Sequence, residues 1–126
     1  MNKLGEYADL SYAITGAVYE VRKQLGCGFL ESVYRKALAY ELQQQSLKAE
    51  QEAPIKILYK GVDLDMNYYA DILVEDRVII ELKTVKAFDD VHRAQIIHYL
   101  KATGIKFGML VNFGNKSAEI ERFVYE

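Results

Sequence analysis

Few residues in this sequence could staple or rigidify a chain: among 126 residues there is one cysteine, Cys27, one proline, Pro54, and no tryptophan. A single cysteine excludes a disulfide within the chain and a zinc site built of cysteines. The scarcity of proline and the 51% of hydrophobic residues argue against disorder. Positive charge is not in excess either, because 16 Lys and Arg stand against 18 Asp and Glu, a net charge of −2. Bulk positive charge therefore does not hold nucleic acid here, although a cation bound at a local acidic site would reverse the sign where phosphate arrives.

Long apolar runs are also missing. The longest, such as Phe107-Gly108-Met109-Leu110-Val111, fall far short of the roughly 18 residues of a membrane span. The opening residues Met1 to Leu10 include Glu6 and Asp9, so we expect no secretory signal. The length suits one compact domain. We therefore predict one domain over residues 1–126, located in the cytoplasm.

Hydrophobic periodicity predicts an α/β protein with the coarse order helix, helix, three strands, helix, two strands. Apolar residues recur every three or four positions in the helical segments and run or alternate in the strand segments. Glycines at positions 26 and 28 are expected to end the first helix, and Asp89 or Asp90 to cap the third. The predicted helices are Leu10–Leu25, Leu30–Gln45 and Asp90–Thr103. The predicted strands are the hairpin of Pro54–Tyr59 and Val62–Met66 around a Lys60-Gly61 turn, followed by Tyr68–Val74, Val78–Lys83, Lys106–Asn112 and Glu119–Tyr125.

The third helix connects two of the predicted strands. A strand, a helix and a strand in this order form a right-handed crossover, which makes Val78–Lys83 and Lys106–Asn112 parallel neighbours. The earlier strands are joined by short turns and are therefore antiparallel. We expect a mixed sheet of about five strands with helices covering at least one face.

The most informative segment is the pair of predicted strands joined by Glu75-Asp76-Arg77. Because side chains alternate between the two faces of a strand, one face of this pair is wholly apolar and is predicted to face the core. The opposite face carries every charge of the two strands. The apolar face comprises Ala70, Ile72, Val74, Val78, Ile80 and Leu82, and the opposite face comprises Tyr69, Asp71, Leu73, Ile79, Glu81 and Lys83.

Pairing of Val74 with Val78 across the three-residue turn places Asp71 directly opposite Glu81, with Cβ atoms on the order of 5 Å apart. A slip of one residue would turn Asp71 into the apolar layer, so the register is strongly specified. Two carboxylates this close repel each other unless a positive charge lies between them. Lys83 alone leaves the trio with a net negative charge, and a divalent metal is the natural further occupant.

Oxygens of Asp71 and Glu81, with the backbone carbonyl of Leu82, suit an octahedral Mg²⁺ that keeps several waters. A metal there would lower the pKa of one water, which Lys83 could orient or deprotonate. The alternative is a surface ion-pair cluster on a wet sheet face, which contributes little. Apolar neighbours on the same face favour a partly enclosed cleft, but spacing alone leaves both interpretations open.

These residues resemble a known family. Asp71 followed by Glu81-Leu82-Lys83 is similar to the D…ExK signature of the PD-(D/E)xK nuclease superfamily, with Ala70 where a proline is usual. Gly28-Phe29-Leu30-Glu31-Ser32-Val33-Tyr34 matches the G-x-x-E-x-x-Y string that gives the GxxExxY protein family of this superfamily its name. Gln95-Ile96-Ile97-His98-Tyr99 resembles the Q-x-x-x-Y string of the lambda-exonuclease and RecB-like branch. Each string is weak alone, but their order and context span nearly the whole chain.

The resemblance implies a restriction-endonuclease-like fold and a metal-dependent nuclease. Asp71, Glu81 and Lys83 would be the catalytic residues. One or two Mg²⁺ or Mn²⁺ ions would be held by Asp71, Glu81, the carbonyl of Leu82 and a third carboxylate, Glu31, reaching over from the second helix.

The same resemblance implies that Tyr34, Gln95 and Tyr99 contact the substrate. An amide and a phenol can hydrogen-bond phosphate oxygens, and the Tyr99 ring could stack on a base. Bland alternatives exist for each motif. Glu31 could simply pair with Arg35 one helical turn away, and Tyr99 could fill a seam between helix and sheet.

Three functions remain in competition. The leading hypothesis is metal-dependent hydrolysis of phosphodiester bonds in nucleic acid, with DNA as the expected substrate. The protein would act alone, as a homo-oligomer or within a larger assembly. The second is a nuclease-fold binding or partner subunit that cleaves little or not at all on its own. The third is a purely structural domain. It predicts no metal binding, and the cluster of charges would then lower the stability of the fold without serving a function.

Overall fold

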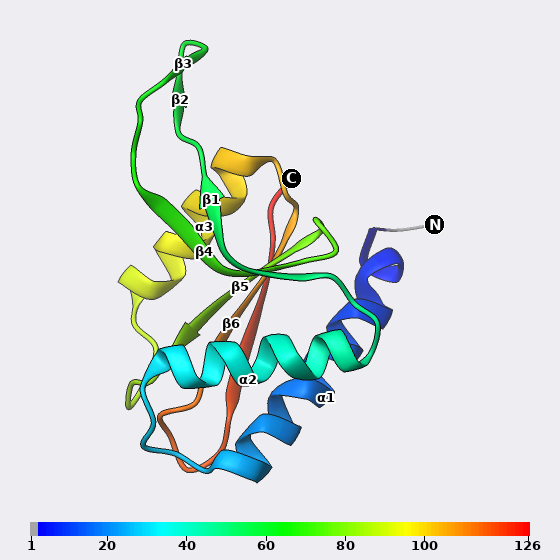
Figure 1. Ribbon diagram of the computed structural model, residues 1–126. Helices are drawn as coiled ribbons and strands as arrows, with labels where there is room; N and C mark the ends of the chain where they lie inside the picture. The colour runs from blue at the N-terminus through cyan, green and yellow to red at the C-terminus, as the bar shows by residue number, and fades with distance from the viewer. Residues whose placement is uncertain (1–2) are drawn as a thin grey trace.

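The computed structural model describes residues 3–126 and contains three helices packed against a five-stranded sheet (Figure 1). The strand order in the sheet is β1-β4-β5-β6-β7, with β5 and β6 parallel and the other neighbours antiparallel. This confirms the predicted mixed α/β sheet and its parallel crossover. The elements are α1 (Lys3–Leu25), α2 (Glu31–Gln44), β1 (Ala49–Ile55), β2 (Leu58–Tyr59), β3 (Val62–Asp63), β4 (Tyr68–Val74), β5 (Val78–Lys83), α3 (Asp90–Thr103), β6 (Phe107–Asn112) and β7 (Glu119–Val124).

Helices cover both faces of the sheet. One hydrophobic cluster joins α1 and α2 to the sheet through residues such as Ile14, Leu38 and Ile80. A second cluster joins α3 to the opposite face through Ile79, Ile96 and Leu100. The sheet is therefore the middle of three layers. No helix among residues 3–126 has the length and hydrophobicity needed to cross a membrane.

The register of the β4–β5 hairpin is the predicted one, since Val74 pairs with Val78 and Ile72 with Ile80. The expected alternation of faces fails at one position. Ala70 belongs to the α3 cluster, whereas Ile72 belongs to the α1–α2 cluster. The neighbouring strand β1 changes sides at the same level, with Glu52 at a φ of 51°. Two adjacent strands thus cross from one hydrophobic layer to the other beside Asp71, and Ala70 is wrongly assigned by simple alternation.

The segment between β1 and β4 differs most from expectation. The predicted strand at Pro54 begins earlier, at Ala49, and pairs with β4. Only two-residue strands, β2 and β3, flank the predicted Lys60-Gly61 turn, and both turn residues have positive φ. Figure 1 shows this hairpin extending away from the three layers. We call residues 56–67 the arm.

The helix ends follow the predicted signals. Asp89 caps α3, where its carboxylate accepts hydrogen bonds from the backbone N–H groups of Val91 and His92. Gly104 ends this helix in the left-handed conformation, with a φ of 74°. At the same end of the molecule as the cap, Arg93 makes two hydrogen bonds to the Glu121 carboxylate on β7, at 2.8 and 2.9 Å. These contacts fix the position of α3 over the sheet.

Candidate active site

Asp71 lies where β4 changes sides, and its carboxylate replaces part of the strand pairing. The Asp71 Oδ2 atom accepts a hydrogen bond of 2.7 Å from the backbone N–H of Leu82 on β5. The side chain is half-buried. Its orientation toward β5 is therefore fixed by a main-chain donor, which holds it beside Glu81.

Glu81 is the unusual group of the molecule, because it is a carboxylic acid that is only 4% exposed. Burial, followed by the side-chain hydrogen bond with Asp71 and the negative charge of Asp71, raises the pKa of Glu81 from 4.5 to about 10. The charge of Lys83 acts in the opposite direction. One Glu81 oxygen, Oε1, is buried and has no hydrogen-bond partner. An acceptor buried without a partner costs about 1–3 kcal/mol, so this oxygen is well suited to bind a positive ligand.

Lys83 ends β5 with a half-buried side chain. Within the described part of the chain its ammonium forms no ion pair within 4 Å. It does lower the pKa of Glu81 through its charge, so the two groups are near each other. The three signature residues are therefore gathered at one end of β4 and β5, and the lysine does not neutralise the acids by direct contact.

Asn112 and Gly114, which motif reasoning missed, fix the main chain that follows Lys83. Asn112 is fully buried on β6 and exchanges two hydrogen bonds with the backbone of Val85, at 2.9 and 2.7 Å. The N–H of Phe113 donates to the carbonyl of Lys83. A Cβ on Gly114 would lie 2.5 Å from the Val85 nitrogen, so only glycine fits there. The available signal was a polar residue ending an otherwise apolar strand, but its partner depends on tertiary structure.

Gln95 and Tyr99 face the same side of the sheet from α3, because residues four apart share one face of a helix. The Gln95 amide Nε2 donates to the Tyr99 hydroxyl at 3.1 Å. Burial raises the pKa of Tyr99, and the negative charges of Glu81 and Asp71 raise it further. The Tyr99 hydroxyl is thus near the acidic pair.

A groove of about 730 Å³ separates α3 from the arm. It is lined by Gln95 and Tyr99 of α3, Leu64 and Met66 of the arm, and Lys83 of β5, together with neighbouring residues. We call it the arm groove. Of the three signature residues Lys83 contributes to its wall, so the groove meets the signature at that lysine.

Glu31 does not join the acidic pair. It is exposed at the first residue of α2. Among the side chains that the structure describes, no three His, Cys, Asp or Glu groups lie close enough together to hold a metal ion. The predicted third ligand is therefore not brought to the site, because α2 packs on the face of the sheet opposite to α3. The local pair with Arg35 is also not formed, since Arg35 instead contacts Glu52, at 3.4 Å.

Tyr34 is a core residue and not a wall of a cleft. Its side chain is fully buried and its ring stacks on Phe113, with ring centroids 4.4 Å apart. Its hydroxyl donates to the carbonyl of Gly26 at 2.7 Å. The expected contact with substrate is incompatible with this burial. The tyrosine instead ties the turn after α1 to the core, and Gly28 in that turn has a φ of 108°.

Comparison with known proteins agrees with the fold. A family profile described as the PD-(D/E)XK nuclease superfamily matches residues 8–123. A solved structure titled "Crystal structure of SSO0001" is similar over 94% of this chain, with a TM-score of 0.57 and 20% sequence identity. The chain spans 59% of the length of that protein. No significant match was found among curated proteins.

Proposed function

Since the chain belongs to the PD-(D/E)XK nuclease superfamily, we propose that it hydrolyses phosphodiester bonds in DNA with the help of Mg²⁺ or Mn²⁺. The observation that carries the proposal is the acidic pair. Glu81 is buried against Asp71, holds its proton at neutral pH and leaves one oxygen without a partner. Such a pair costs stability in a purely structural domain, whereas a divalent cation that displaced the proton would neutralise both carboxylates.

The residues present fit a divalent cation. Asp71 and Glu81 supply two carboxylates, and the Leu82 carbonyl is a third oxygen on the same strand end. Hard divalent cations prefer such oxygen ligands, and Mg²⁺ keeps several waters when few protein ligands are offered. When bound, the ion would lower the pKa of a water and withdraw charge from the phosphate. Two carboxylates are enough for one ion, and a second ion would have to be shared with substrate phosphate.

The remaining roles belong to side chains on the α3 side of the sheet. Lys83 has a positive charge that is not consumed by an ion pair, so it can orient the attacking water and stabilise negative charge that develops on the phosphate. Gln95 and Tyr99 offer an amide and a hydroxyl to phosphate oxygens without adding charge. Their mutual hydrogen bond holds both polar ends at the same place beside the acidic pair.

We further assign the chain to the GxxExxY group within the superfamily, and near its lambda-exonuclease and RecB-like branch. The first assignment rests on Gly28, Glu31 and Tyr34, and the second on Gln95 and Tyr99. Of the first set, Gly28 and Tyr34 have structural duties that explain their presence in the string. A lone exposed cysteine, Cys27, suits the reducing cytoplasm as the place of action.

A second function has one observation in its favour. The two-carboxylate site lacks a third acidic ligand among the described side chains. This favours a nuclease-fold subunit that binds nucleic acid and relies on a partner, or a second copy, for cleavage.

The deciding experiment compares wild type with Asp71→Asn and Lys83→Ala. Matched controls are Asp9→Asn and Lys101→Ala, which alter exposed residues of α1 and α3. We expect cation-dependent cleavage of DNA by wild type and both controls, no cleavage by the two site variants, and unchanged circular dichroism throughout.

Calorimetric titration with Mn²⁺ separates the alternatives. Binding by wild type, reduced in Asp71→Asn, together with cleavage supports the nuclease. Binding without cleavage of single- or double-stranded DNA or RNA favours the partner subunit. Equal cleavage by wild type and Lys83→Ala would refute the role given to that lysine.

A further inference from the structure

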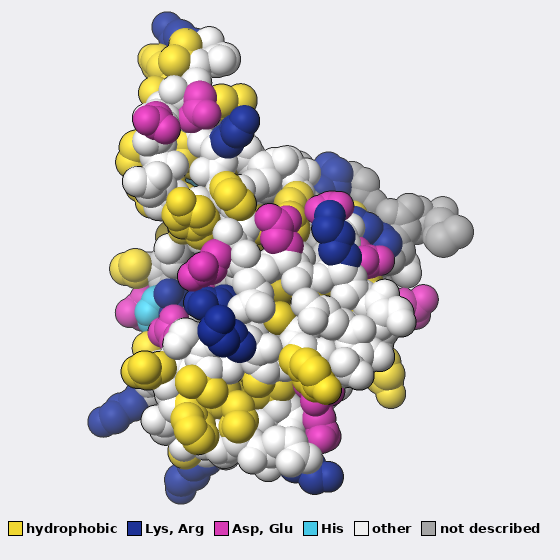
Figure 2. Space-filling model, viewed as in Figure 1, with side chains coloured by type: hydrophobic (Ala, Val, Ile, Leu, Met, Phe, Trp, Pro, Cys, Tyr) yellow, Lys and Arg dark blue, Asp and Glu magenta, His cyan; other side chains and the backbone are white. Residues whose placement is uncertain are grey.

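The arm leaves several large hydrophobic side chains exposed, because a two-stranded hairpin has no core in which to bury them. Leu58, Tyr59, Val62, Leu64 and Met66 are each between 46% and 61% exposed. Figure 2 shows hydrophobic side chains gathered over this projecting hairpin. Monomeric proteins rarely leave contiguous apolar surface of this kind uncovered unless it binds something.

Part of this surface faces the arm groove and not bulk solvent. Leu64 and Met66 line one side, and α3 forms the other. The volume of about 730 Å³ lies within the range of about 300–1,000 Å³ that is usual for ligand sites. Lys83 is part of the lining, so a molecule in the groove reaches its ammonium, two residues along β5 from Glu81. The arm therefore provides a wall of the groove that ends at this lysine.

The groove offers aromatic faces beside that lysine. Tyr68 and Tyr99 lie across from each other with ring centroids 6.1 Å apart and planes inclined by 50°. Tyr99 is only 6% exposed and supports Tyr68 from beneath, whereas Tyr68 is 41% exposed and keeps much of its surface free for stacking. His92 and His98 line the α3 side. Successive bases of a single strand stack on such exposed aromatic side chains.

The charge of the groove distinguishes an unpaired strand from a duplex. Lys83 is the sole Lys or Arg in its lining, and within the described chain no Asp or Glu lines it. A duplex presents phosphates outward and keeps its bases stacked inside, so its binding depends on many cationic contacts. An unpaired strand presents bases to the apolar and aromatic walls and needs a positive charge only at the phosphate to be attacked.

We propose that the arm groove binds a single, unpaired nucleic-acid strand, stacks a base on Tyr68 and thereby restricts the enzyme to single-stranded substrate. This rests on the proposed nuclease function for the chemistry but not for the binding. The arm and α3 hold the strand while Lys83 meets one phosphate. DNA and RNA share the recognised features, base faces and phosphate, and are separate arms of the test.

The test measures fluorescence anisotropy with the full-length Asp71→Asn protein in EDTA, so that no strand is cut. The probes are labelled DNA and RNA single strands of roughly 12 nucleotides, comparable to other single-strand sites, and the DNA duplex of the same sequence. We expect at least one single strand to bind more tightly than the duplex. With one or two phosphate contacts, the slope of log K against log salt for a single strand should be about −1.

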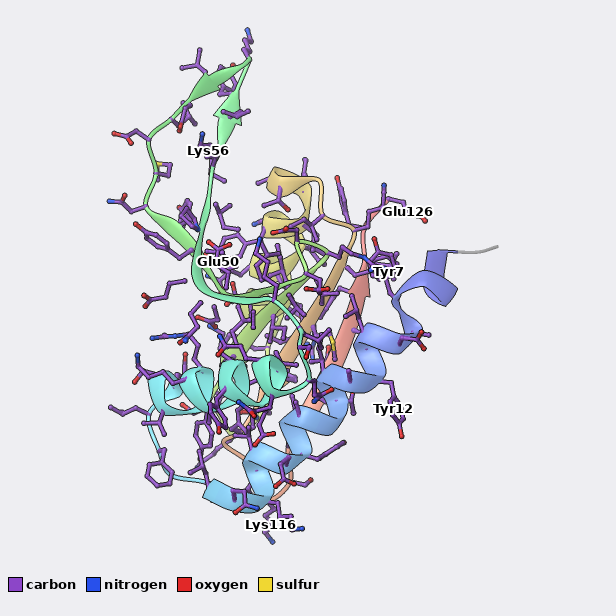
Figure 3. All side chains as sticks on the ribbon, turned by 45° about the vertical axis from the view of Figure 1, so that its right-hand side comes forward. Tyr7, Tyr12, Glu50, Lys56, Lys116 and Glu126 are labelled. Carbon is purple, nitrogen blue, oxygen red and sulfur yellow. The ribbon has the colours of Figure 1, made fainter. Side chains whose placement is uncertain are left out.

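Three added substitutions locate the binding. Tyr68→Ala should weaken single-strand binding roughly 5- to 100-fold, and Tyr68→Phe should restore it because stacking needs the ring and not the hydroxyl. Leu64→Gln should weaken it less. Tyr12→Ala is the matched control, since Tyr12 is 83% exposed on α1, and Figure 3 shows it far from the arm that begins at Lys56.

The outcomes separate this proposal from the function on which it draws. Tighter binding of the duplex, or equal effects of Tyr68→Ala and Tyr12→Ala, overturns the single-strand site even if wild type cleaves duplex DNA. Single-strand binding that depends on Tyr68, without cleavage by wild type, supports the site and contradicts the nuclease. The alternative occupant of the groove is a second copy of this chain, which sedimentation detects as a dimer. A dimer that Leu64→Gln dissociates, with single-strand binding unchanged, would show that the arm contacts a second copy instead.

Discussion

Glu81→Gln should stabilise the protein when no divalent cation is present, although it removes a residue of the proposed active site. The pKa of Glu81 is about 10 in the folded protein and about 4.5 in the unfolded chain. The stability that its proton contributes is therefore complete below about pH 4.5 and is lost progressively as the pH rises toward 10. Glutamine has a similar shape, can donate its amide N–H to Asp71 as the protonated acid does, and does not titrate.

The magnitude follows from linkage between proton binding and folding. Between the two pKa values, the free energy of unfolding of wild type falls by about 1.4 kcal/mol per pH unit relative to the variant. At about pH 7 the difference reaches at most about 3 kcal/mol, and near pH 4.5 it vanishes. Cation binding offsets most of this difference at about 100 times the Kd of Mn²⁺, where wild type gains about 2.7 kcal/mol, and reverses the order at about 1,000 times the Kd, where it gains about 4.1 kcal/mol and the variant far less.

Urea unfolding in EDTA at several pH values from about 5 to 8 measures this difference directly. Glu50→Gln is the control, because Glu50 is exposed on β1 (Figure 3) and its substitution should shift the curve little at any pH. If the stability of wild type and of Glu81→Gln changed in parallel with pH, Glu81 would not be held protonated by burial, and the acidic pair would lose its status as a preformed cation site.

Three further predictions concern the framework of the site. Asn112→Ala should lower the free energy of unfolding by about 2–4 kcal/mol, because the backbone N–H and carbonyl of Val85 lose their hydrogen-bond partners. It should also slow cleavage, because the end of β5 becomes less firmly held. Denaturation and cleavage assays on the same preparation measure both effects. Tyr34→Phe should cost about 1 kcal/mol for the hydroxyl bond to Gly26 and leave the cleavage rate unchanged, and a large loss of rate would restore its role in substrate binding. Asp89→Ala should cost about 1 kcal/mol through the lost cap of α3, measured by thermal unfolding, with no change for Asp9→Ala.

The sequence was most informative where short-range rules determine the structure. The β4–β5 register, with Val74 opposite Val78 and Ile72 opposite Ile80, followed from alternation and a three-residue turn within one hairpin. The ends of α3 followed from Asp89 and Gly104 because capping is local. The shared face of Gln95 and Tyr99 on α3 needed only helical spacing, whereas their hydrogen bond is a finding of the structure.

The failures all involve contacts between distant segments. Ala70 leaves the predicted face because two strands bend together, which no alternation rule within one strand contains. Tyr34 is buried because Phe113, far along the chain, stacks on it. Glu31 was expected near the acids from the resemblance alone, and the packing of α2 on the other layer separates them. Asn112 escaped notice because its partner, Val85, is defined only once β5 and β6 lie side by side.

The turn at Glu75 and Asp76 has a consequence for how this protein can change. Both residues have positive φ, and the N–H of Arg77 closes the turn on the carbonyl of Val74. Adding or removing one residue at this distant loop would slide β4 past β5 and separate the two acids, although nothing near them had been altered. Most surface hairpins tolerate variation in loop length, but the β4–β5 hairpin should not. Related chains that keep the chemistry should show substitutions at these three positions but not gaps.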